Sequence, residues 1–293
     1  MRPATARLGY WLIAPAALLL AAVALIPIAA AFFLSLQQRL PIFQIVRFVG
    51  LENYRFLAID PRFWNSLGNT LYFTFLAVAL ELALGLAVAL LLDRAFPGRG
   101  SMRAIVLLPW AIPTVVSSRM WEWLYNVEFG LLNFLLTESG LTSGPINWLG
   151  DPFWAIHAAI LIDVWKSTPF AAILLTAGLQ TIPRELYLAA RVDGAGAWGI
   201  FRHIILPSLR PIILVVLLFR TLDAFRVFDA IYVLTAGGPG NTTETLSIYI
   251  YKVLFQTLQF GYGTTLAVAM FLCVVGISLL YLALLGRERR LSS

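Results

Sequence analysis

Six long apolar stretches constrain what this chain can fold into more than any other feature. They cover residues 8–36, 67–92, 104–124, 153–179, 212–234 and 264–285. Because a helix needs about 20 apolar residues to cross the hydrocarbon core of a bilayer, each stretch predicts one crossing. Hydrophobic residues make up 60% of the sequence and charged residues only 12%, unlike soluble proteins. We therefore expect an all-α, polytopic membrane protein with six transmembrane helices, since lipid leaves the backbone no outside hydrogen-bond partner.

The order of these stretches divides the chain into three parts. Residues 1–66 hold the N-terminus, the first transmembrane helix and an outer segment, residues 67–286 hold a core of five transmembrane helices, and residues 287–293 form a tail. The first apolar stretch is too long for the core of a signal peptide, so it predicts a retained helix. The outer segment, residues 37–65, reads as an amphipathic piece at the membrane surface, with a partner-docking element as the alternative.

The distribution of basic residues predicts the orientation. One side holds twelve of them: Arg2, Arg7, Arg94, Arg99, Arg103, Arg184, Arg191, Arg202, Arg210, Arg287, Arg289 and Arg290. The opposite side holds five: Arg39, Arg47, Arg55, Arg62 and Lys252. By the positive-inside rule, both termini are expected to be cytoplasmic in a multi-pass protein of the plasma (inner) membrane. The net charge of +6 is thus a topology signal, and nothing in the sequence indicates a nucleic-acid partner.

The loop between the fourth and fifth stretches, residues 181–211, is expected to be structured and cytoplasmic. Thr181 is a candidate cap for a first short helix and Asp193 for a second, which is expected to end at Pro207. Directly after Asp193, residues 194–197 are Gly or Ala. Such small side chains let another backbone approach closely, so this loop suits a shallow groove on a partner.

Ionisable residues inside the predicted spans are costly in lipid and usually face one another or a wet cavity. Asp163 and Lys166 are three residues apart, as are Asp223 and Arg226, and this spacing predicts pairs along a helix. Two interpretations stay open: a structural ion-pair network, or a polar lining for a passing solute. Sugars suit such a lining, because their hydroxyls bind charged groups and their C–H faces pack on aromatic rings. The candidate pathway residues are Trp110, Asp163, Trp165, Lys166, Arg220, Asp223, Phe225, Arg226 and Asp229, with Glu81 as a further charge in a span.

Other kinds of site find little support. Cys273 stands alone in the last span, and His157 and His203 lie in different segments, so we expect neither a metal site nor a catalytic residue. The sequence contains no P-loop signature. We therefore expect no cofactor on this chain, and any ATP would be hydrolysed by another one.

Several motifs in fixed order resemble a known family. In the loop, Leu188-Ala189-Ala190, Asp193-Gly194-Ala195 and Leu206-Pro207 are similar to the cytoplasmic coupling loop of ABC importer permeases of the maltose-type branch. The similarity continues through residues 163–170 and 178–180 upstream and through residues 220–229 and 234–239 downstream, and spans most of residues 67–285. One position departs from the pattern: the usual Glu is replaced by Leu188, and Glu185 or Arg191 are the alternatives for its contact.

This resemblance implies a fold, a function and partners. The fold would be that of type I ABC importer permeases, and the chain would be a transport subunit, not an enzyme, importing an oligosaccharide or glucoside such as maltose or trehalose. It would pair with a second homologous permease, two ATPase chains carrying ATP and Mg, and an extracytoplasmic sugar-binding protein. The residues implied to contact the ATPase are Leu188, Ala189, Ala190, Arg191, Asp193, Gly194, Ala195 and Gly196. The alternatives are an ion-coupled secondary transporter and an ABC permease for a non-sugar solute such as glycerol phosphate.

Overall fold

The structure is a computed structural model that describes residues 3–291, with side chains described for residues 11–286. Arg2 therefore lies outside the described residues, and so do the side chains of Arg7, Arg287, Arg289 and Arg290. The chain forms two compact units, one of residues 1–63 and 249–272 and one of residues 64–248 and 273–293. Each unit is described by itself.

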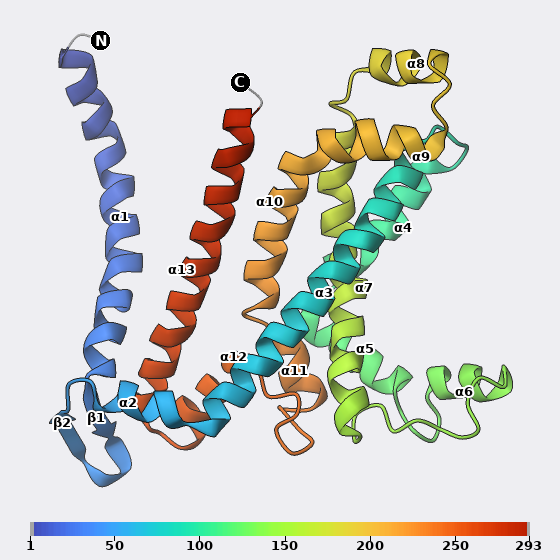
Figure 1. Cartoon of the computed structure of the whole chain (residues 1–293). Helices are drawn as coiled ribbons and strands as arrows, with labels where there is room; N and C mark the ends of the chain where they lie inside the picture. Colours follow the sequence, from blue (N-terminus) through green and yellow to red (C-terminus); the bar gives the residue numbers. More distant parts are fainter. Residues whose placement is uncertain (1–2, 292–293) are drawn as a thin grey trace. The chain divides into compact units, whose positions relative to one another are not determined.

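The first unit contains a long helix and a small hairpin (Figure 1). Its elements are α1 (Pro3–Ser35), β1 (Gln37–Leu40), a 3-10 turn (Pro41–Phe43), β2 (Ile45–Phe48), α2 (Glu52–Ile59), a π-helical turn (Lys252–Gln256) and the start of α13 (Phe260–Leu291). β1 and β2 pair antiparallel, with Gln37 opposite Phe48 and Leu40 opposite Ile45. The sequence patterns did not indicate this hairpin. No residue in the most apolar window of α1 is buried within the structure, so the side chains there are available to contact lipid or another chain.

Asp60 joins three elements of the first unit. It lies between α2 and α3 (Pro61–Asp93), and its Oδ1 accepts the backbone N–H of Arg62 at 2.9 Å. Its Oδ2 accepts the hydroxyl of Tyr249 at 2.7 Å and the hydroxyl of Tyr262. Burial acts to raise the pKa of Asp60, but these hydrogen bonds and the backbone N–H groups outweigh it and hold that pKa below the ordinary value.

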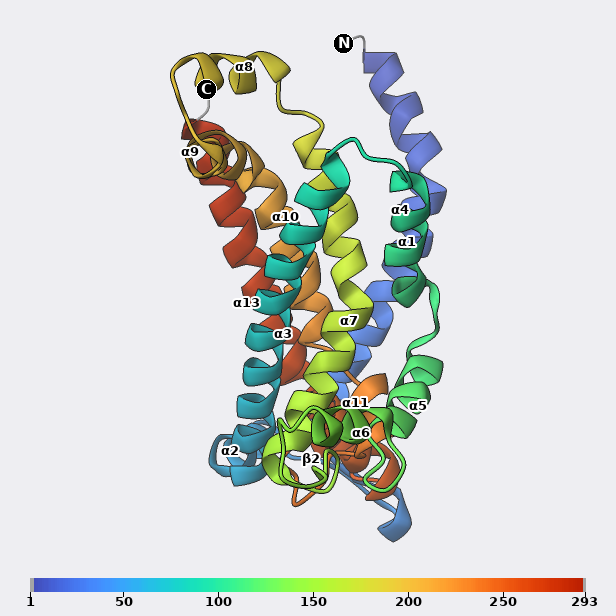
Figure 2. The same ribbon diagram turned by 90° about the vertical axis from the view of Figure 1, so that its right-hand side faces the viewer.

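The second unit is a bundle of helices around α7. It contains most of α3, then α4 (Arg99–Ala111), α5 (Thr114–Leu124), α6 (Leu131–Glu138), α7 (Pro152–Leu179), α8 (Arg184–Val192), α9 (Ala197–Ile200), a π-helical turn (Phe201–Ile205), α10 (Leu206–Ala224), α11 (Asp229–Leu234) and the start of α12 (Leu246–Tyr251). Figures 1 and 2 both show α8 at one end of this bundle and α6 at the other. α7 packs against α4, α5, α10 and α11, which makes it the central helix.

Local signals in the sequence explain how α7 begins and why α3 lies close to it. The carboxylate of Asp151 accepts the backbone N–H groups of Phe153 at 2.9 Å and Trp154 at 3.1 Å, which caps the helix. A Cβ built on Gly85 of α3 would lie 2.7 Å from the Cβ of Ala171 on α7. Small residues thus bring these two helices into close contact, as is common between helices in membranes.

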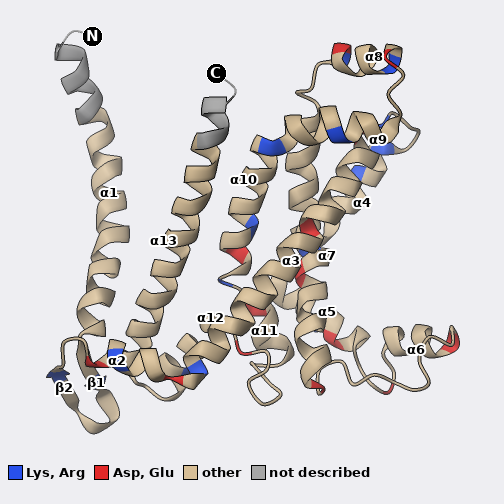
Figure 3. Ribbon diagram, viewed as in Figure 1, with Lys and Arg blue, Asp and Glu red and all other residues tan. Residues whose placement is uncertain are grey.

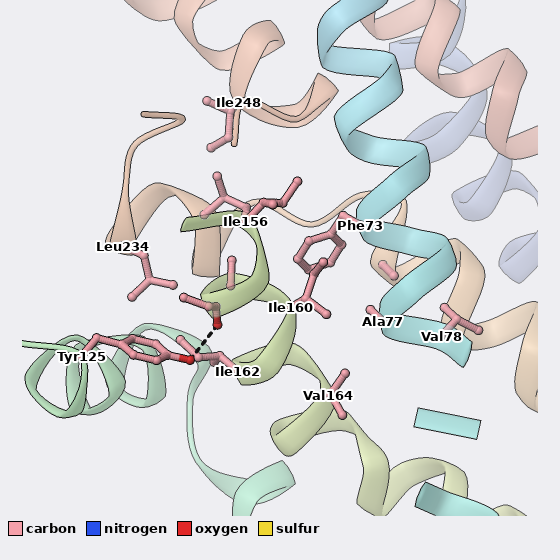
Figure 4. Packing of buried hydrophobic residues seen from close by; sticks show 14 residues of the cluster. Phe73, Ala77, Val78, Tyr125, Ile156, Ile160, Ile162, Val164, Leu234 and Ile248 are labelled. Atoms are coloured by element: carbon pink, nitrogen blue, oxygen red, sulfur yellow. Dashed lines mark hydrogen bonds between the residues drawn. The ribbon is translucent and has the colours of Figure 1, made fainter. Parts of the chain in front are cut away.

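Two apolar clusters hold the bundle together. One lies towards α11 and includes Phe73, Tyr125, Ile160 and Ile231, and Figure 4 shows the hydroxyl of Tyr125 donating to the carbonyl oxygen of Ala158, at 2.9 Å. The other lies towards α8 and contains Ala89, Ala171, Leu175, Leu179, Ile182, Leu209 and Val216.

The described helices confirm the predicted crossings. Five are long and apolar enough to span a membrane, and α4 with α5 makes a sixth, bent by 96°. The bend lies at Ile112–Pro113, between the end of α4 and the start of α5, as the proline in this stretch predicted. The fifth predicted crossing is interrupted as well, since α10 ends at Ala224 and α11 begins at Asp229.

Candidate functional site

A polar pocket lies where two interrupted spans meet inside the second unit. The pocket has a volume of about 290 Å³ and is lined by Thr114, Asp163, Asp223, Arg226, Val227, Phe228, Asp229 and Ala230. Thr114 is the first residue of α5, and residues 225–228 form the break between α10 and α11. Interrupted helices at membrane depth are tolerated where they line a water-filled cavity, and in transporters they form solute sites.

Arg220 is the centre of a buried ion network behind this pocket. Its guanidinium binds Glu81 of α3 through two hydrogen bonds, Nε to Oε2 at 2.6 Å and Nη2 to Oε1 at 2.8 Å. Nη2 also reaches Oδ2 of Asp163 on α7 at 3.2 Å, and Nη1 reaches Oδ2 of Asp223 at 2.6 Å. Arg220 thus joins α3, α7 and α10. Figure 3 shows that charged residues are few along these helices.

The exposure of the network changes sharply along its length. The side chain of Glu81 is 0% exposed and that of Arg220 is 6% exposed, whereas the side chain of Asp223 is 66% exposed. The two-pronged contact with Glu81 uses two of the five N–H donors of the guanidinium in a dry site, and such bidentate, charge-assisted pairs are strong. The inner end of the network is therefore structural, and its outer end at Asp223 is accessible from the pocket.

Both predicted pairs at three-residue spacing are wrong. Asp223 binds Arg220 instead of Arg226, whose Nε donates to the carbonyl oxygen of Leu222 at 3.0 Å. Lys166 likewise does not bind Asp163: its Nζ donates to the carbonyl oxygens of Trp110, at 3.4 Å, and Ile112. The end of α4 provides the reason, because Pro113 ends the helix and leaves those carbonyl groups without a helical partner.

The aromatic candidates separate into different environments. Trp110 is half exposed and its ring lies 6.1 Å from that of Phe170, whereas Trp165 packs edge-on against Trp121 at 5.6 Å. Phe225 is buried and lines an apolar pocket with residues of α3, α10 and α13, and it does not line the polar pocket. Phe228 is the aromatic residue that lines the polar pocket, where its ring stacks on Tyr232 with centroids 5.2 Å apart.

Sequence reasoning did not select Thr114 for the site, and it named Phe228 only as one of several aromatic residues in the same spans as the charged candidates. Both lie at helix breaks: Thr114 directly follows Pro113, and Phe228 directly precedes α11. A proline or a polar run inside an apolar stretch was the signal that could have identified them. Of the predicted residues, the structure brings Asp163, Asp223, Arg226 and Asp229 to the pocket, with Arg220 behind Asp163 and Asp223.

The loop of residues 181–211 contains two helices as predicted, but their ends differ from the prediction. The hydroxyl of Thr181 donates to the carbonyl oxygen of Gly178, and Pro183 precedes α8, so Thr181 does not cap it. Asp193 ends α8 instead of capping the next helix, which begins after Gly196. The second helix also continues past Pro207, because a π-helical turn with a bond from Leu206 N to Phe201 O accommodates the proline.

Gly194 explains how α8 turns into the small-residue segment. Its φ of +77° lies in the left-handed region, and the N–H groups of Gly194 and Ala195 donate to the carbonyl oxygens of Arg191 and Ala190, at 3.1 Å and 2.8 Å. This is the Schellman arrangement that ends many helices at a glycine. The loop thus requires Gly194 for its conformation, and it leaves space around both Gly194 and Gly196, where an added Cβ would meet nothing within 4 Å.

The loop combines an exposed surface with a fixed base. Leu188, Val192 and Trp198 are exposed, and so are most of the residues implied to contact the ATPase. On the inner side, Tyr187, Ile204 and Ile205 pack against the second apolar cluster. The loop is therefore held against the ends of the membrane helices while it presents apolar and small side chains outward.

Comparisons with known proteins agree on the class of protein. The family described as "binding-protein-dependent transport system inner membrane component" matches residues 81–290. The trehalose/maltose transport system permease protein MalF of Thermococcus litoralis is 43% identical over 285 residues, covering 97% of this chain and 95% of the relative. The sulfoquinovosyl glycerol transport system permease protein SmoG of Agrobacterium fabrum is 40% identical, covering 95% of this chain and 90% of the relative. In fold, the chain is similar to the crystal structure of a bacterial ABC transporter involved in the import of the acidic polysaccharide alginate, with a TM-score of 0.81 at 24% identity, covering 96% of this chain and 95% of the other.

Proposed function

We propose that this chain forms the path of a sugar across the membrane. The proposal proceeds from its family: the chain belongs to the binding-protein-dependent transport system inner membrane components. The sugar is an oligosaccharide or a glucoside such as maltose or trehalose. The relative MalF is named for trehalose and maltose, and SmoG for sulfoquinovosyl glycerol. The chain itself is a transport subunit, and ATP with Mg belongs to separate ATPase chains.

The observation that carries this proposal is the charged, accessible edge of the polar pocket. Asp223, Arg226 and Asp229 are exposed along a stretch that is otherwise apolar enough to span a membrane. Charged side chains at that depth are too costly to face lipid, so they face water, a solute or another chain. Carboxylates accept hydroxyl protons and the Phe228 ring offers an apolar face, a combination that suits a sugar.

The pocket needs a second chain to close around a whole sugar. Its volume of about 290 Å³ is at the lower end for small-molecule sites, and three of its charged residues are exposed. A second, homologous permease facing Asp223 and Asp229 would complete the site and shield these charges from lipid. An extracytoplasmic binding protein would deliver the sugar at the end of the unit that carries α6.

Movement of the loop helices would link the pocket to ATP hydrolysis. The proposed ATPase contact lies on α8 and the following turn, from Leu188 to Gly196, with Leu188 as an apolar contact where the family has Glu. Both termini and this loop are proposed to be cytoplasmic, from the excess of basic residues there. Closure of two ATPase chains must favour one access state by about 5.5 kcal/mol to invert a 1:99 population.

Within the permease, two sets of contacts would hold helices together while the loop moves. Arg220 fastens α3, α7 and α10 together through Glu81, Asp163 and Asp223. Lys166 fixes the end of α4 by binding the carbonyl oxygens of Trp110 and Ile112. The break at Pro113 therefore stays in place next to the pocket, and displacement of the loop is transmitted through α7 and α10 to Asp163 and Asp223.

Asp229→Asn tests the solute site. In proteoliposomes that contain the whole transporter, we expect uptake of labelled trehalose or maltose to fall by about tenfold or more. This factor corresponds to the loss of one hydrogen bond to a charged group. The complex should assemble normally, because Asp229 is exposed. Glu138→Gln, on exposed α6 and outside the pocket, is the matched control and should transport normally. Normal uptake by Asp229→Asn would contradict a role of this residue in the solute path.

Gly196→Trp tests the ATPase contact. Gly196 has an ordinary negative φ of −73° and open space around it, so the bulky ring should leave the fold intact. We expect membranes that carry this variant to recover less ATPase in a pull-down. Gly144→Trp, placed where an added Cβ also meets nothing within 4 Å but in the loop after α6, should recover it fully. Equal recovery by both variants would show that the ATPase does not bind this turn.

Two observations separate this proposal from its alternatives. The pocket contains the three carboxylates Asp163, Asp223 and Asp229 and the single cation Arg226 among its lining residues, a balance that disfavours an anion such as glycerol phosphate. An ion-coupled transporter would not need the structured cytoplasmic loop. Sugar uptake that resists vanadate, an inhibitor of ATPases of this kind, would favour ion coupling over the proposed importer.

A further inference from the structure

The β1–β2 hairpin carries an apolar surface that nothing in its own unit covers. At its tip, Ile42 is 63% exposed and Phe43 is 69% exposed. Val46 and Phe48 on β2 and Leu51 beyond it are exposed to a similar degree, between 63% and 66%. Large exposed apolar patches on a protein surface usually mark a binding surface for another protein or for a membrane.

The base of the hairpin is fixed to the end of a membrane helix. The amide of Asn53 donates to the carbonyl oxygens of Ser35, at 2.8 Å, and Gln37, at 2.9 Å. The hydroxyls of Ser35 and Tyr54 lie 2.7 Å apart, and Val49 N donates to Leu36 O at 2.9 Å. Because α1 ends at Ser35, the hairpin begins where the apolar stretch leaves the bilayer. Its tip is thus confined to a short distance from the membrane surface.

The charges around the apolar tip are basic. Residues 37–59 contain Arg39, Arg47 and Arg55 but only one acidic residue, Glu52. All three arginines are exposed. Arg39 lies three residues before Ile42 and Arg47 lies four residues after Phe43, so both lie within roughly 10 Å of the tip, across a 3-10 turn and the adjoining strand ends. Interfacial segments bury their apolar face about 5–10 Å into the boundary between headgroups and acyl chains, so these guanidinium groups would lie at the level of the phosphates.

We propose that the hairpin binds the outer surface of the bilayer, with Ile42 and Phe43 inserted below the headgroups and Arg39 and Arg47 bound to the phosphates of anionic phospholipids. Two observations favour lipid over a protein partner: the direct connection to α1 and the basic residues that flank the apolar tip. The contact would hold the outer end of α1 at a constant depth. This inference does not depend on which solute the protein carries.

A spin label on the tip tests the proposal in the intact transporter. Cys273→Ser removes the cysteine at position 273, which lies in α13, and Phe43→Cys then accepts a nitroxide at an exposed position that the fold does not need. The transporter is reconstituted in vesicles of phosphatidylethanolamine and phosphatidylglycerol. We expect the label to collide often with oxygen, which concentrates in lipid, and rarely with a water-soluble nickel chelate. A label at Ser143, an exposed residue of the loop after α6, should show the opposite preference.

Three results would overturn the proposal. Free collision with nickel at Phe43, as at Ser143, would mean that the tip lies in water. Low collision with both reagents would mean that the tip is buried against another chain of the transporter. Nickel access that falls only when the binding protein is added would identify that protein as the occupant.

The arginines give a second test. In the same vesicles, Arg39→Gln with Arg47→Gln should shift the label at Phe43 towards the nickel reagent, because the phosphate contacts are lost. The charge-conserving pair Arg39→Lys with Arg47→Lys should keep most of the preference for oxygen, since electrostatic attraction to anionic lipid needs only the charge. An unchanged preference in the Gln pair would show that the basic residues do not hold the hairpin on the lipid.

Discussion

Replacing Arg220 by Met should destabilise the second unit through the carboxylate that it leaves behind. Glu81 is 0% exposed, and Arg220 donates two hydrogen bonds to it, at 2.6 Å and 2.8 Å. Without the guanidinium, a buried charge has lost its counterion, which costs about 3–5 kcal/mol. Native proteins are stable by only about 5–15 kcal/mol, so this loss is a large share of the total. The expected fall in thermal midpoint is on the order of 10 °C.

A double substitution separates this mechanism from a general effect of altering the core. Arg220→Met with Glu81→Leu replaces the pair by apolar side chains of similar length, and such replacements are often neutral or stabilising. We therefore expect the double variant to recover most of the stability lost in Arg220→Met, although Asp163 and Asp223 still lose a partner. Asp223→Asn should cost only about 0–1 kcal/mol, because its side chain is 66% exposed and screened by water.

The assay is thermal unfolding of the purified transporter in lipid nanodiscs, with the amount of assembled complex measured beside it. The reasoning would be refuted if Arg220→Met melted like the wild type, or if the double variant melted as low as the single one. The first result would show that Glu81 does not need Arg220. The second would show that the cost comes from lost packing around Arg220 and not from an unpaired charge.

Three further predictions follow from the orientation, the loop and the first unit. In the Cys273→Ser background, a cysteine at Ser101 should be labelled only from the cytoplasmic side and one at Ser143 only from outside; the reverse pattern would invert the topology. Gly194→Ala should cost about 1–2 kcal/mol in thermal stability, because its φ is +77°. A cost near zero, in the same melting assay, would mean that the turn adapts. The pKa of Asp60 is lowered on folding, so its contribution to stability is present above the ordinary value of 3.8 and is lost as pH falls through the folded value. Tyr249→Phe removes one hydrogen-bond donor to Asp60, so the free energy of unfolding at neutral pH should fall. The further decrease of that free energy in acid should then be smaller than in the wild type. An unchanged acid profile would show that the hydroxyl does not stabilise the carboxylate.

Membrane crossings could be predicted from the sequence because their cause is local. A stretch of sufficient length and apolarity must span, whatever lies beside it. The 96° bend at Pro113 was predictable for the same reason, since a missing N–H and a bulky ring act on the residue's own helix. The hairpin at residues 37–48 was not, because strands as short as β1 and β2 present too few residues to show an alternating pattern.

Two carboxylate partners of Arg220 could not be predicted, because Glu81 and Asp163 lie on helices that are distant from it in the sequence. Spacing along one helix suggested a bond between Asp223 and Arg226, whereas Arg220 collects carboxylates from α3, α7 and α10. Lys166 found its partners in a helix end that only the fold brings near. The structure thus brings several of the charged candidates together at one pocket, but Asp163 and Asp223 bind Arg220 instead of Lys166 and Arg226.

The loop shows the same limit at helix ends. Thr181 and Asp193 are both good capping residues by type, and neither caps the helix predicted for it. The glycine at position 194 determined the end of α8 more strongly, through its left-handed conformation. A Schellman turn depends on several backbone bonds at once, and a single-residue preference does not reveal it.

The contact between Arg220 and Glu81 also affects how the protein is made. The two residues are 139 positions apart, so a ribosome adding about 5–20 residues per second synthesises Arg220 roughly 7 to 28 seconds after Glu81. During that interval α3 must remain in the bilayer with a carboxyl group that has no counterion, and the rest of the helix must offset its insertion cost. The mean hydropathy of 2.6 in the apolar window of α3 provides that margin. Polar substitutions on the lipid-facing side of α3 should therefore impair insertion during synthesis, even where the finished protein would tolerate them.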